Sequence, residues 1–122
     1  MTPENLSIIL VEPQGPINIG SVCRTMMNFG FTQLRLVNPT KHYKSLLAKK
    51  MALTAFTVLE DALIFEDLQS ALSDIQIAFG TTRRFGKYRK NFFTPSGAAK
   101  KIRQTYESIS CALVLGPEDT GL

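Results

Sequence analysis

Short apolar runs alternate with segments of helical periodicity along the 122-residue chain. The runs are rich in Ile, Leu and Val and too short for most helices, which is typical of strands buried on both faces. They predict strands at Leu6–Glu12, Gln33–Asn38, Ala62–Phe65, Ile75–Gly80 and Cys111–Gly116. Apolar residues at helical spacing between the runs predict helices from Asn18 to Gly30, Ser45 to Leu59, Glu66 to Asp74 and Pro95 to Ser108.

This alternation determines the fold class that we expect. Strands that alternate with helices form βαβ crossovers, so the sequence predicts an α/β fold with a mostly parallel sheet and helices on both faces. No linker divides the chain, and residues 1–122 are expected to form a single domain. Ligands of such sheets bind beyond the carboxyl ends of the strands, where we place the loops Pro13–Asn18, Thr81–Asn91 and Gly116–Leu122.

The segment NIGSVCRTMMNFG opens the first predicted helix with residues that core packing does not require. Asn18 suits the N-cap, and Gly20 removes a side chain where a ligand would approach the helix end. Arg24 lies one turn after Gly20 and leans back over that gap. Two interpretations stay open: a capped helix with a solvated arginine, or a helix end at which Asn18 and Arg24 hold one anionic group. The apolar residues form a separate stripe: Ile19, Val22, Cys23, Met26 and Met27.

The charged residues of the sequence include one strongly basic loop. The net charge is only +4, from 14 Lys and Arg against 10 Asp and Glu. Residues 83–90 nevertheless contain five cations and no acid, interleaved with aromatic residues, which suits a phosphate backbone and the stacking of unpaired bases. The alternative is a solvated loop whose aromatic side chains lie in the core. The cations are Arg83, Arg84, Lys87, Arg89 and Lys90.

The segment LGPEDTGL follows the last predicted strand. Gly116 allows a cofactor to lie against bare backbone, and Glu118 either orders the turn or faces a substrate. A generic turn is the alternative.

Cys23 and Cys111 lie in apolar runs without metal-ligand spacing, so we expect buried free thiols and no metal site. The only histidine, His42, follows a proline in a loop and receives no role.

Missing motifs narrow the range of functions. The sequence has no Ser/His/Asp set, no GxGxxG and no Walker lysine, so the hydrolase, NAD-dependent and kinase classes lose support. No apolar run approaches the roughly 18 residues that a membrane span needs. The N-terminus shows no basic segment followed by an apolar one. We therefore expect a cytoplasmic protein without a membrane partner.

Two motifs, in this order, resemble those of a known enzyme family. Asn18-x-Gly20-x-x-x-Arg24 after the first strand and LGPEDTGL after a late strand are similar to motifs 1 and 2 of the SpoU/TrmH RNA 2′-O-ribose methyltransferases, in the SPOUT superfamily. The opening IILVEPQGPINIGSVCRTMMNFGFTQLRLVNP is closest to the TrmJ-like branch, which methylates tRNA in the anticodon loop. FGTTRR matches that branch in position. The likeness runs from Leu6 to Leu122, with a weaker middle.

The resemblance implies S-adenosylmethionine-dependent 2′-O-methylation of RNA, with tRNA favoured and rRNA possible. Such enzymes have an α/β fold with a trefoil knot, bind the cofactor in that knot, and act as homodimers with the active site between the subunits. Residue by residue, the likeness gives catalytic roles to Asn18, Arg24 and Glu118. It gives cofactor contacts to Thr81, Thr82, Arg83 and Gly116, and RNA contacts to Arg83, Arg84, Lys87, Arg89 and Lys90.

The sequence departs from the family pattern in one respect. Motif 3, a Ser-Leu-Asn run that leads into the last helix, is absent, and the chain stops inside motif 2. We therefore expect that the chain is a fragment of a longer protein, truncated before the knot is completed. Alone, it is expected to be inactive and to bind the cofactor weakly. The other interpretation is that the protein is an inactive remnant of such an enzyme. A non-catalytic RNA-binding module on the same fold is the alternative function, and a purely structural α/β domain is a third.

Overall fold

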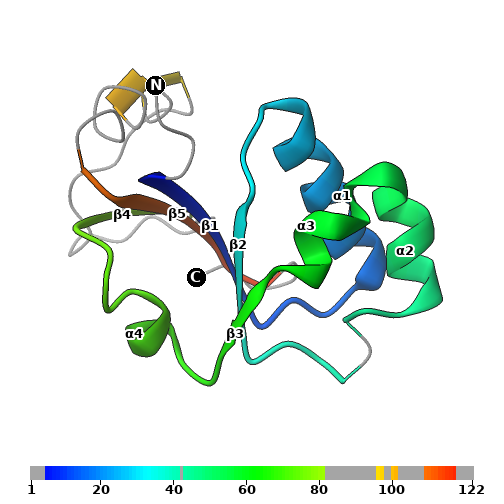
Figure 1. Cartoon of the computed structure of the whole chain (residues 1–122). Coiled ribbons are helices and arrows are strands. Elements are labelled where there is room, and N and C mark those ends of the chain that lie inside the picture. Colours follow the sequence, from blue (N-terminus) through cyan, green and yellow to red (C-terminus); the bar gives the residue numbers. More distant parts are fainter. Residues whose placement is uncertain (1–4, 42, 82–95, 98–99, 102–108, 118–122) are drawn as a thin grey trace.

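A five-stranded parallel sheet lies at the centre of the computed structural model (Figure 1), which describes residues 5–41, 43–81, 96–97, 100–101 and 109–117. Neighbouring strands pair in parallel in the order β3-β2-β1-β5-β4. Each strand falls inside one of the apolar runs, so the predicted α/β fold with a parallel sheet is confirmed. The strands are β1 (Leu6–Val11), β2 (Gln33–Val37), β3 (Leu63–Phe65), β4 (Ile77–Gly80) and β5 (Cys111–Leu115).

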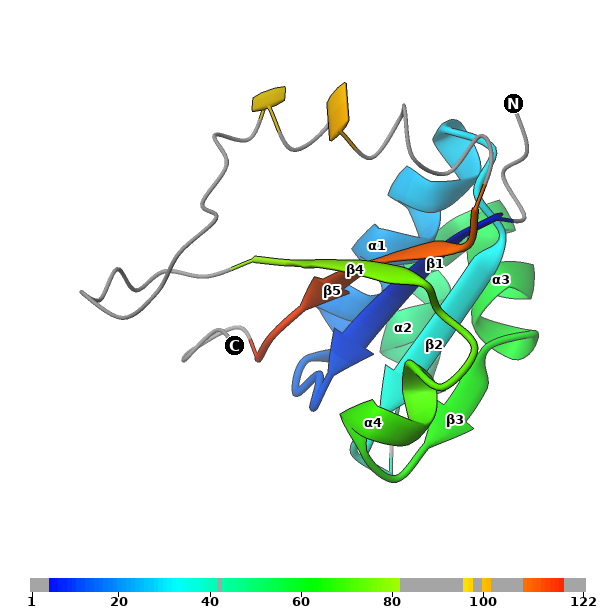
Figure 2. The same cartoon turned by 90° about the vertical axis from the view of Figure 1, so that its left-hand side faces the viewer.

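Helices cover both faces of this sheet, as Figures 1 and 2 show: α1, α2 and α3 lie on one face and α4 on the other. The helix predicted from Ser45 to Leu59 is interrupted, because Leu53 adopts a left-handed backbone with φ of 54° at the end of α2. Of the helix predicted from Pro95 to Ser108, residues 96–97 and 100–101 are helical, and the rest lies outside the described residues. The helices are α1 (Pro16–Asn28), α2 (Leu46–Ala52), the 3-10 turn η2 (Leu53–Ala55), α3 (Phe56–Glu60) and α4 (Leu68–Ala71).

The hydrophobic core divides into two clusters because successive strand residues point to opposite faces of the sheet. The larger cluster joins the strands to α1, α2 and α3, and its buried members include Leu6, Ile8, Leu10, Ile19, Cys23, Leu36, Ala48, Ala52 and Leu59. The smaller cluster lies on the α4 face and consists of Ile9, Val37, Ala71, Ala112 and Val114. Most of the apolar burial therefore fixes α1 and α2 against the sheet, next to the carboxyl end of β1.

A buried arginine holds α4 on its face of the sheet. Arg35 of β2 is only 6% exposed. Its Nη1 donates to the carbonyl of Ala71 at 2.7 Å and to Oδ1 of Asp74 at 2.6 Å, while Nη2 donates to Oδ2 of Asp74 at 3.0 Å. Such a two-pronged contact is stronger and more directional than a single hydrogen bond. The pair therefore connects β2 with the end of α4.

This ion pair predicts a specific loss of stability in acid. The hydrogen bond from Arg35 lowers the pKa of Asp74 below its ordinary 3.8. Because the folded-state pKa is the lower one, the stabilisation is present above pH 3.8 and is lost as the pH falls through the folded-state value. We expect Asp74→Asn to flatten the decline in unfolding free energy between about pH 5 and 3, measured by urea denaturation. Asp61→Asn makes the same charge change at the exposed end of α3, and an equal flattening in that control would contradict the assignment.

Candidate functional site at the carboxyl edge of the sheet

The carboxyl ends of β1 and β5 form the topological switch point of the sheet. From β1 the chain continues to β2 on one side, whereas β5 and β4 lie on the other side. Figure 2 shows the arrowheads of β1 and β5 side by side, with the chain after β1 turning into α1. Open α/β sheets bind their ligands in the crevice at such a point. Two of the three loops singled out from the sequence begin here, after Val11 and after Leu115.

The strand ends at this edge hold two residues in a strained conformation that the sequence analysis missed. Glu12 and Asn38 both have left-handed backbones, with φ of 49° and 48°. Each donates its N–H to the end of the next strand at 2.8 Å, Glu12 to the Val37 carbonyl and Asn38 to the Phe65 carbonyl. A left-handed non-glycine residue costs about 1 kcal/mol, and such strain concentrates at functional edges. Both residues stand in a Val-X-Pro sequence, and a residue before proline is ordinarily extended, so the sequence gives no signal for a left-handed backbone here.

The predicted N-cap role of Asn18 is wrong. The N-cap lies three residues earlier, at Gly15 with an extended backbone, and Pro16 is in the first turn. Proline suits that position because its φ is already helical and the N–H it lacks would have no intrahelical partner. Asn18 is therefore an exposed residue of the first turn. Its amide reaches back toward the N-cap, since a Cβ at Gly15 would lie 3.7 Å from Asn18 Nδ2.

Gly20 also has a different role from the one that its position suggested. It is buried against α2, and a Cβ there would lie 2.6 Å from Met51 Cβ, 2.8 Å from the Ala48 oxygen and 2.9 Å from the Ala52 nitrogen. Two of these atoms belong to the backbone and cannot move without moving α2. The missing side chain thus permits close packing of two helices, and the prediction that it opens space for a ligand is wrong.

Arg24 lies one turn after Gly20 on the same side of α1, and its side chain is exposed. Within the described residues it makes no ion pair. Asn18 and Arg24 are six positions apart, so they project about 120° apart around α1 and about 9 Å apart along it. The helix alone does not bring the two side chains together. Their catalytic roles remain predictions.

Thr81 and Gly116 are brought together at the ends of neighbouring strands. Thr81 donates its N–H to the Val114 carbonyl at 3.0 Å and its Oγ1 lies 3.4 Å from the same oxygen, which ties the end of β4 to β5. Gly116 follows β5 directly and is half-buried. The edge therefore places two of the predicted cofactor residues next to the switch point. The other predicted site residues lie outside the described residues: Thr82, Arg83, Arg84, Lys87, Arg89, Lys90 and Glu118.

The two cysteines are buried free thiols, as predicted. Burial raises the pKa of Cys23 to about 11 and also raises the pKa of Cys111. Both are protonated at neutral pH and lack the thiolate that a nucleophile needs. In the described part of the chain, no three His, Cys, Asp or Glu side chains are grouped to hold a metal ion. None of the helices described there combines the length and apolar character that a bilayer span requires.

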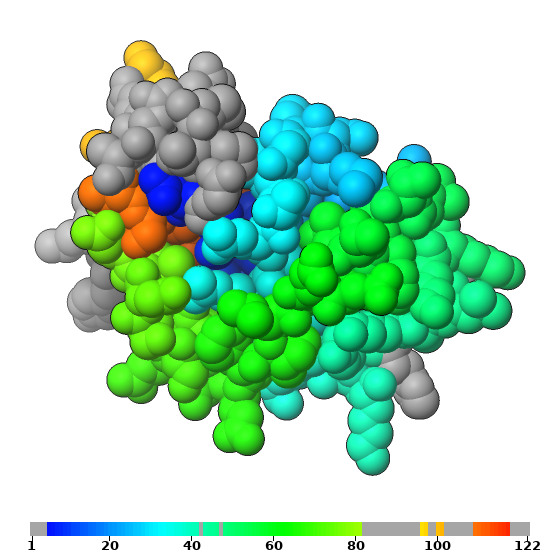
Figure 3. All heavy atoms as spheres, in the orientation of Figure 1, coloured from blue at the N-terminus to red at the C-terminus, as the bar shows by residue number. Residues whose placement is uncertain are grey.

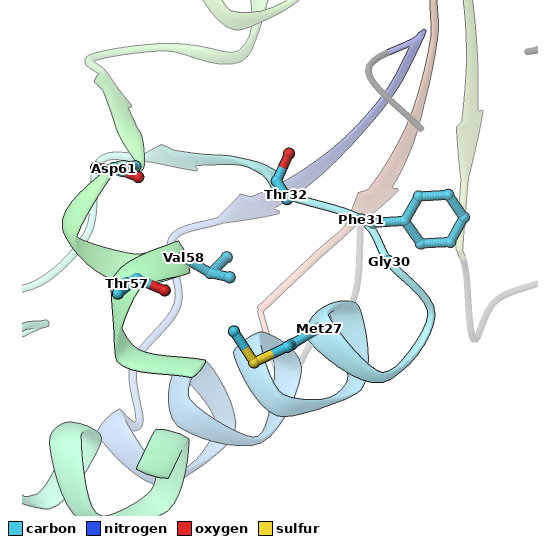
Figure 4. Close-up of a pocket in the computed structure, with 7 residues that line it drawn as sticks. All are labelled: Met27, Gly30, Phe31, Thr32, Thr57, Val58 and Asp61. Atoms are coloured by element: carbon cyan, nitrogen blue, oxygen red, sulfur yellow. The ribbon is translucent and has the colours of Figure 1, made fainter. Parts of the chain in front are cut away.

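A shallow pocket of about 120 Å³ lies at the opposite edge of the sheet. In Figure 4, Met27 at the end of α1 and Val58 of α3 face each other across it, beside the chain that enters β2. The other lining residues are Gly30, Phe31, Thr32, Thr57 and Asp61. Small-molecule sites usually measure about 300–1,000 Å³, so this pocket is too small for a nucleoside-sized ligand. The candidate site therefore remains at the carboxyl edge.

These features define an open α/β protein whose candidate ligand site lies at the switch point between β1 and β5. Residues 5–122 match the model of the SpoU rRNA Methylase family. The chain belongs to this family. The resemblance drawn from the motifs around Asn18 and Gly116 is thereby confirmed.

The similar proteins include both curated sequences and solved structures. The chain is 34% identical to the tRNA (cytidine-2′-O-)-methyltransferase TrmJ of Methanocaldococcus jannaschii, covering 96% of this chain and 51% of that protein. Its fold matches a probable methylase family protein of Haemophilus influenzae with a TM-score of 0.87 at 29% identity, covering 99% of this chain and 50% of that one. TrmJ from Z. mobilis ZM4 gives a TM-score of 0.82 at 36% identity, covering 95% and 51%. The chain spans about half the length of the curated relatives it matches.

Proposed function

We propose that the protein transfers a methyl group from S-adenosylmethionine to the 2′-hydroxyl of a ribose in RNA, with tRNA as the favoured substrate. The observation that carries the proposal is the family match, because it spans both the β1–α1 segment and the end of β5. These two segments meet at the switch point of the sheet, where this fold class binds ligands. The name of the M. jannaschii relative supports tRNA.

The chemistry requires a positioned hydroxyl and stabilisation of the charge that develops on it. When bound, S-adenosylmethionine would supply an electrophilic methyl group for the ribose oxygen, and the hydroxyl would have to lose its proton. A guanidinium group has only hydrogen-bond donors and no acceptor, so Arg24 does not take up that proton. In the proposed site it binds the adjacent phosphate and stabilises the forming alkoxide. The proton then passes to a phosphate oxygen or to water.

The described residues fit a nucleoside cofactor at the strand ends. Gly116 leaves the main chain bare after β5, and Thr81 holds the neighbouring strand end against it. We propose that Thr81, Thr82, Arg83 and Gly116 contact the cofactor and that Asn18, Arg24 and Glu118 face the ribose. The residues of the basic loop would bind RNA. Following the family likeness, we also propose a homodimer.

A methyl-transfer assay with the full-length gene product tests the function. Unmodified tRNA transcripts are incubated with S-adenosylmethionine that carries a tritiated methyl group. We expect label in the RNA, recovered as a 2′-O-methyl nucleoside whose 3′ phosphodiester resists alkali. The same transcript with a 2′-deoxyribose at the labelled position serves as the control and should remain unlabelled.

Two results would count against the proposal. Label recovered on a base would identify a different methyltransferase reaction. RNA binding without any methyl transfer, in a preparation that also binds no cofactor by calorimetry, would favour the non-catalytic RNA-binding module.

A further inference from the structure

One long segment of the chain carries only positive charge. Between Glu12 and Glu60 the chain contains six Lys and Arg residues and no acid. One of the six, Arg35, is buried on the α4 face and paired with Asp74. The other five are exposed and belong to the α1–α2 side of the molecule. Four of them form what we call the α2 basic surface: Lys41, Lys44, Lys49 and Lys50.

This surface begins at the carboxyl edge of the sheet and continues along α2. The segment after β2 leaves that edge and enters α2, which forms the right-hand side of the molecule in Figures 1 and 3. Gly20 lets the backbone of α2 approach α1 at Ala48 and Ala52. Arg24 lies one turn after Gly20 on the same side of α1. Arg24 and the α2 basic surface therefore belong to the same layer of helices, on one face of the sheet.

Helix stability accounts for two of these lysines and not for the other two. Lys49 and Lys50 lie in the last turn of α2, where positive charge is favourable to the helix dipole. Lys41 and Lys44, however, precede the N-cap Ser45, at the end of the helix where positive charge is unfavourable. Lys44 and Lys49 lie over aromatic rings, 5.7 Å from the centre of Tyr43 and 5.0 Å from the centre of Phe56. Those rings hold the side chains at the surface without neutralising them.

We infer that the α2 basic surface binds the phosphate backbone of the RNA substrate and guides it to the ribose site beside Arg24. This inference rests on the proposed function and adds a binding surface to it. Lysines release counterions from RNA when they contact phosphates, and such contacts position the strand without reading its sequence. Leu46 and Leu53 are 68% and 61% exposed beside the lysines, so a protein partner is the competing occupant of this face.

The test is RNA binding by the variant Lys49→Gln/Lys50→Gln of the full-length gene product, measured by fluorescence anisotropy with a labelled tRNA transcript. We expect Kd to rise roughly tenfold and the slope of log K against log salt to fall in magnitude by about 2. Lys49→Arg/Lys50→Arg keeps both charges and should bind within about twofold of the wild type. The matched control Lys100→Gln/Lys101→Gln loses the same charge on the opposite side of the molecule (Figure 1) and should have a smaller effect. Circular dichroism confirms that each variant is folded.

The outcomes separate this inference from the proposed function. Unchanged RNA affinity in Lys49→Gln/Lys50→Gln would overturn the inference and favour a protein partner on the face between Leu46 and Leu53. Equal losses in the two glutamine pairs would also overturn it, since net charge alone would then explain binding. In both cases a wild-type rate of 2′-O-methylation at saturating RNA would leave the proposed function intact. A wild-type protein that binds no RNA would refute both.

Discussion

Replacing Gly20 with alanine is expected to lower the free energy of unfolding by about 2 kcal/mol, within the range observed for overpacked cores. The added methyl would meet the Ala48 oxygen at 2.8 Å and the Ala52 nitrogen at 2.9 Å, so α1 and α2 must separate. Their separation would disturb the larger core cluster, which contains Ile19 and Cys23 of α1 together with Ala48 and Ala52 of α2. Thermal or urea denaturation of the protein measures the change.

The sign of this effect distinguishes two explanations of the glycine. In an exposed helix interior, alanine is about 1 kcal/mol more favourable than glycine. A glycine that merely leaves room for a ligand therefore predicts a more stable alanine variant. A glycine required for helix packing predicts a less stable one, because the backbone clash outweighs the gain in helix propensity. A bulkier Gly20→Val variant should be less stable still.

Gly15→Ala provides the matched control for this experiment. Gly15 has an extended backbone with φ of −104°, which alanine adopts without strain, and the methyl group of the new side chain would lie 3.7 Å from its nearest non-local atom. We expect its unfolding free energy to stay within about 1 kcal/mol of the wild type. A Gly20→Ala variant as stable as Gly15→Ala would show that α2 does not depend on the missing side chain.

The elements of the fold were predictable because their signals are local. Each strand carries its own run of aliphatic residues, and the stripe of Ile19, Cys23 and Met26 identifies the buried side of α1. The errors arose at element ends. The start of α1 was misplaced because Asn18 is a favoured N-cap residue, whereas the N-cap is Gly15, three residues earlier, and Pro16 fixes the first turn. The interruption at Leu53 follows from a single left-handed residue that no residue preference indicates.

The site was only partly predictable, because several of its features depend on contacts between distant parts of the chain. That Thr81 and Gly116 are neighbours follows from the parallel pairing of β4 with β5. By contrast, the role of Gly20 depends on the approach of α2, and the burial of Arg35 depends on Asp74 beyond α4. The spacing of residues within one helix or strand does not reveal that α2 packs against Gly20 or that Asp74 pairs with Arg35. The same limitation hid the α2 basic surface, because that α2 packs against α1 at Gly20 is evident only in the structure.

Among the site residues, Arg24 is expected to give the largest functional effect. In the full-length gene product, Arg24→Ala should reduce kcat for RNA methylation by about 100- to 1,000-fold, the cost of removing one donor to a developing oxyanion. Arg24→Lys keeps the charge but loses the planar fork, so it should recover only part of the rate. Because the Arg24 side chain is exposed, neither variant should lose fold stability.

Cofactor binding separates a ribose-site role for Arg24 from a cofactor-site role. By calorimetry, the affinity of Arg24→Ala for S-adenosylmethionine should stay within about twofold of the wild type, since we place the cofactor at Thr81 and Gly116 on the other side of the switch point. Asn28→Ala, an exposed change one turn further along the same helix, serves as the control and should keep the wild-type kcat. If Arg24→Ala loses as much affinity for the cofactor as it loses in kcat/KM, Arg24 would have to be assigned to cofactor binding and not to the ribose site.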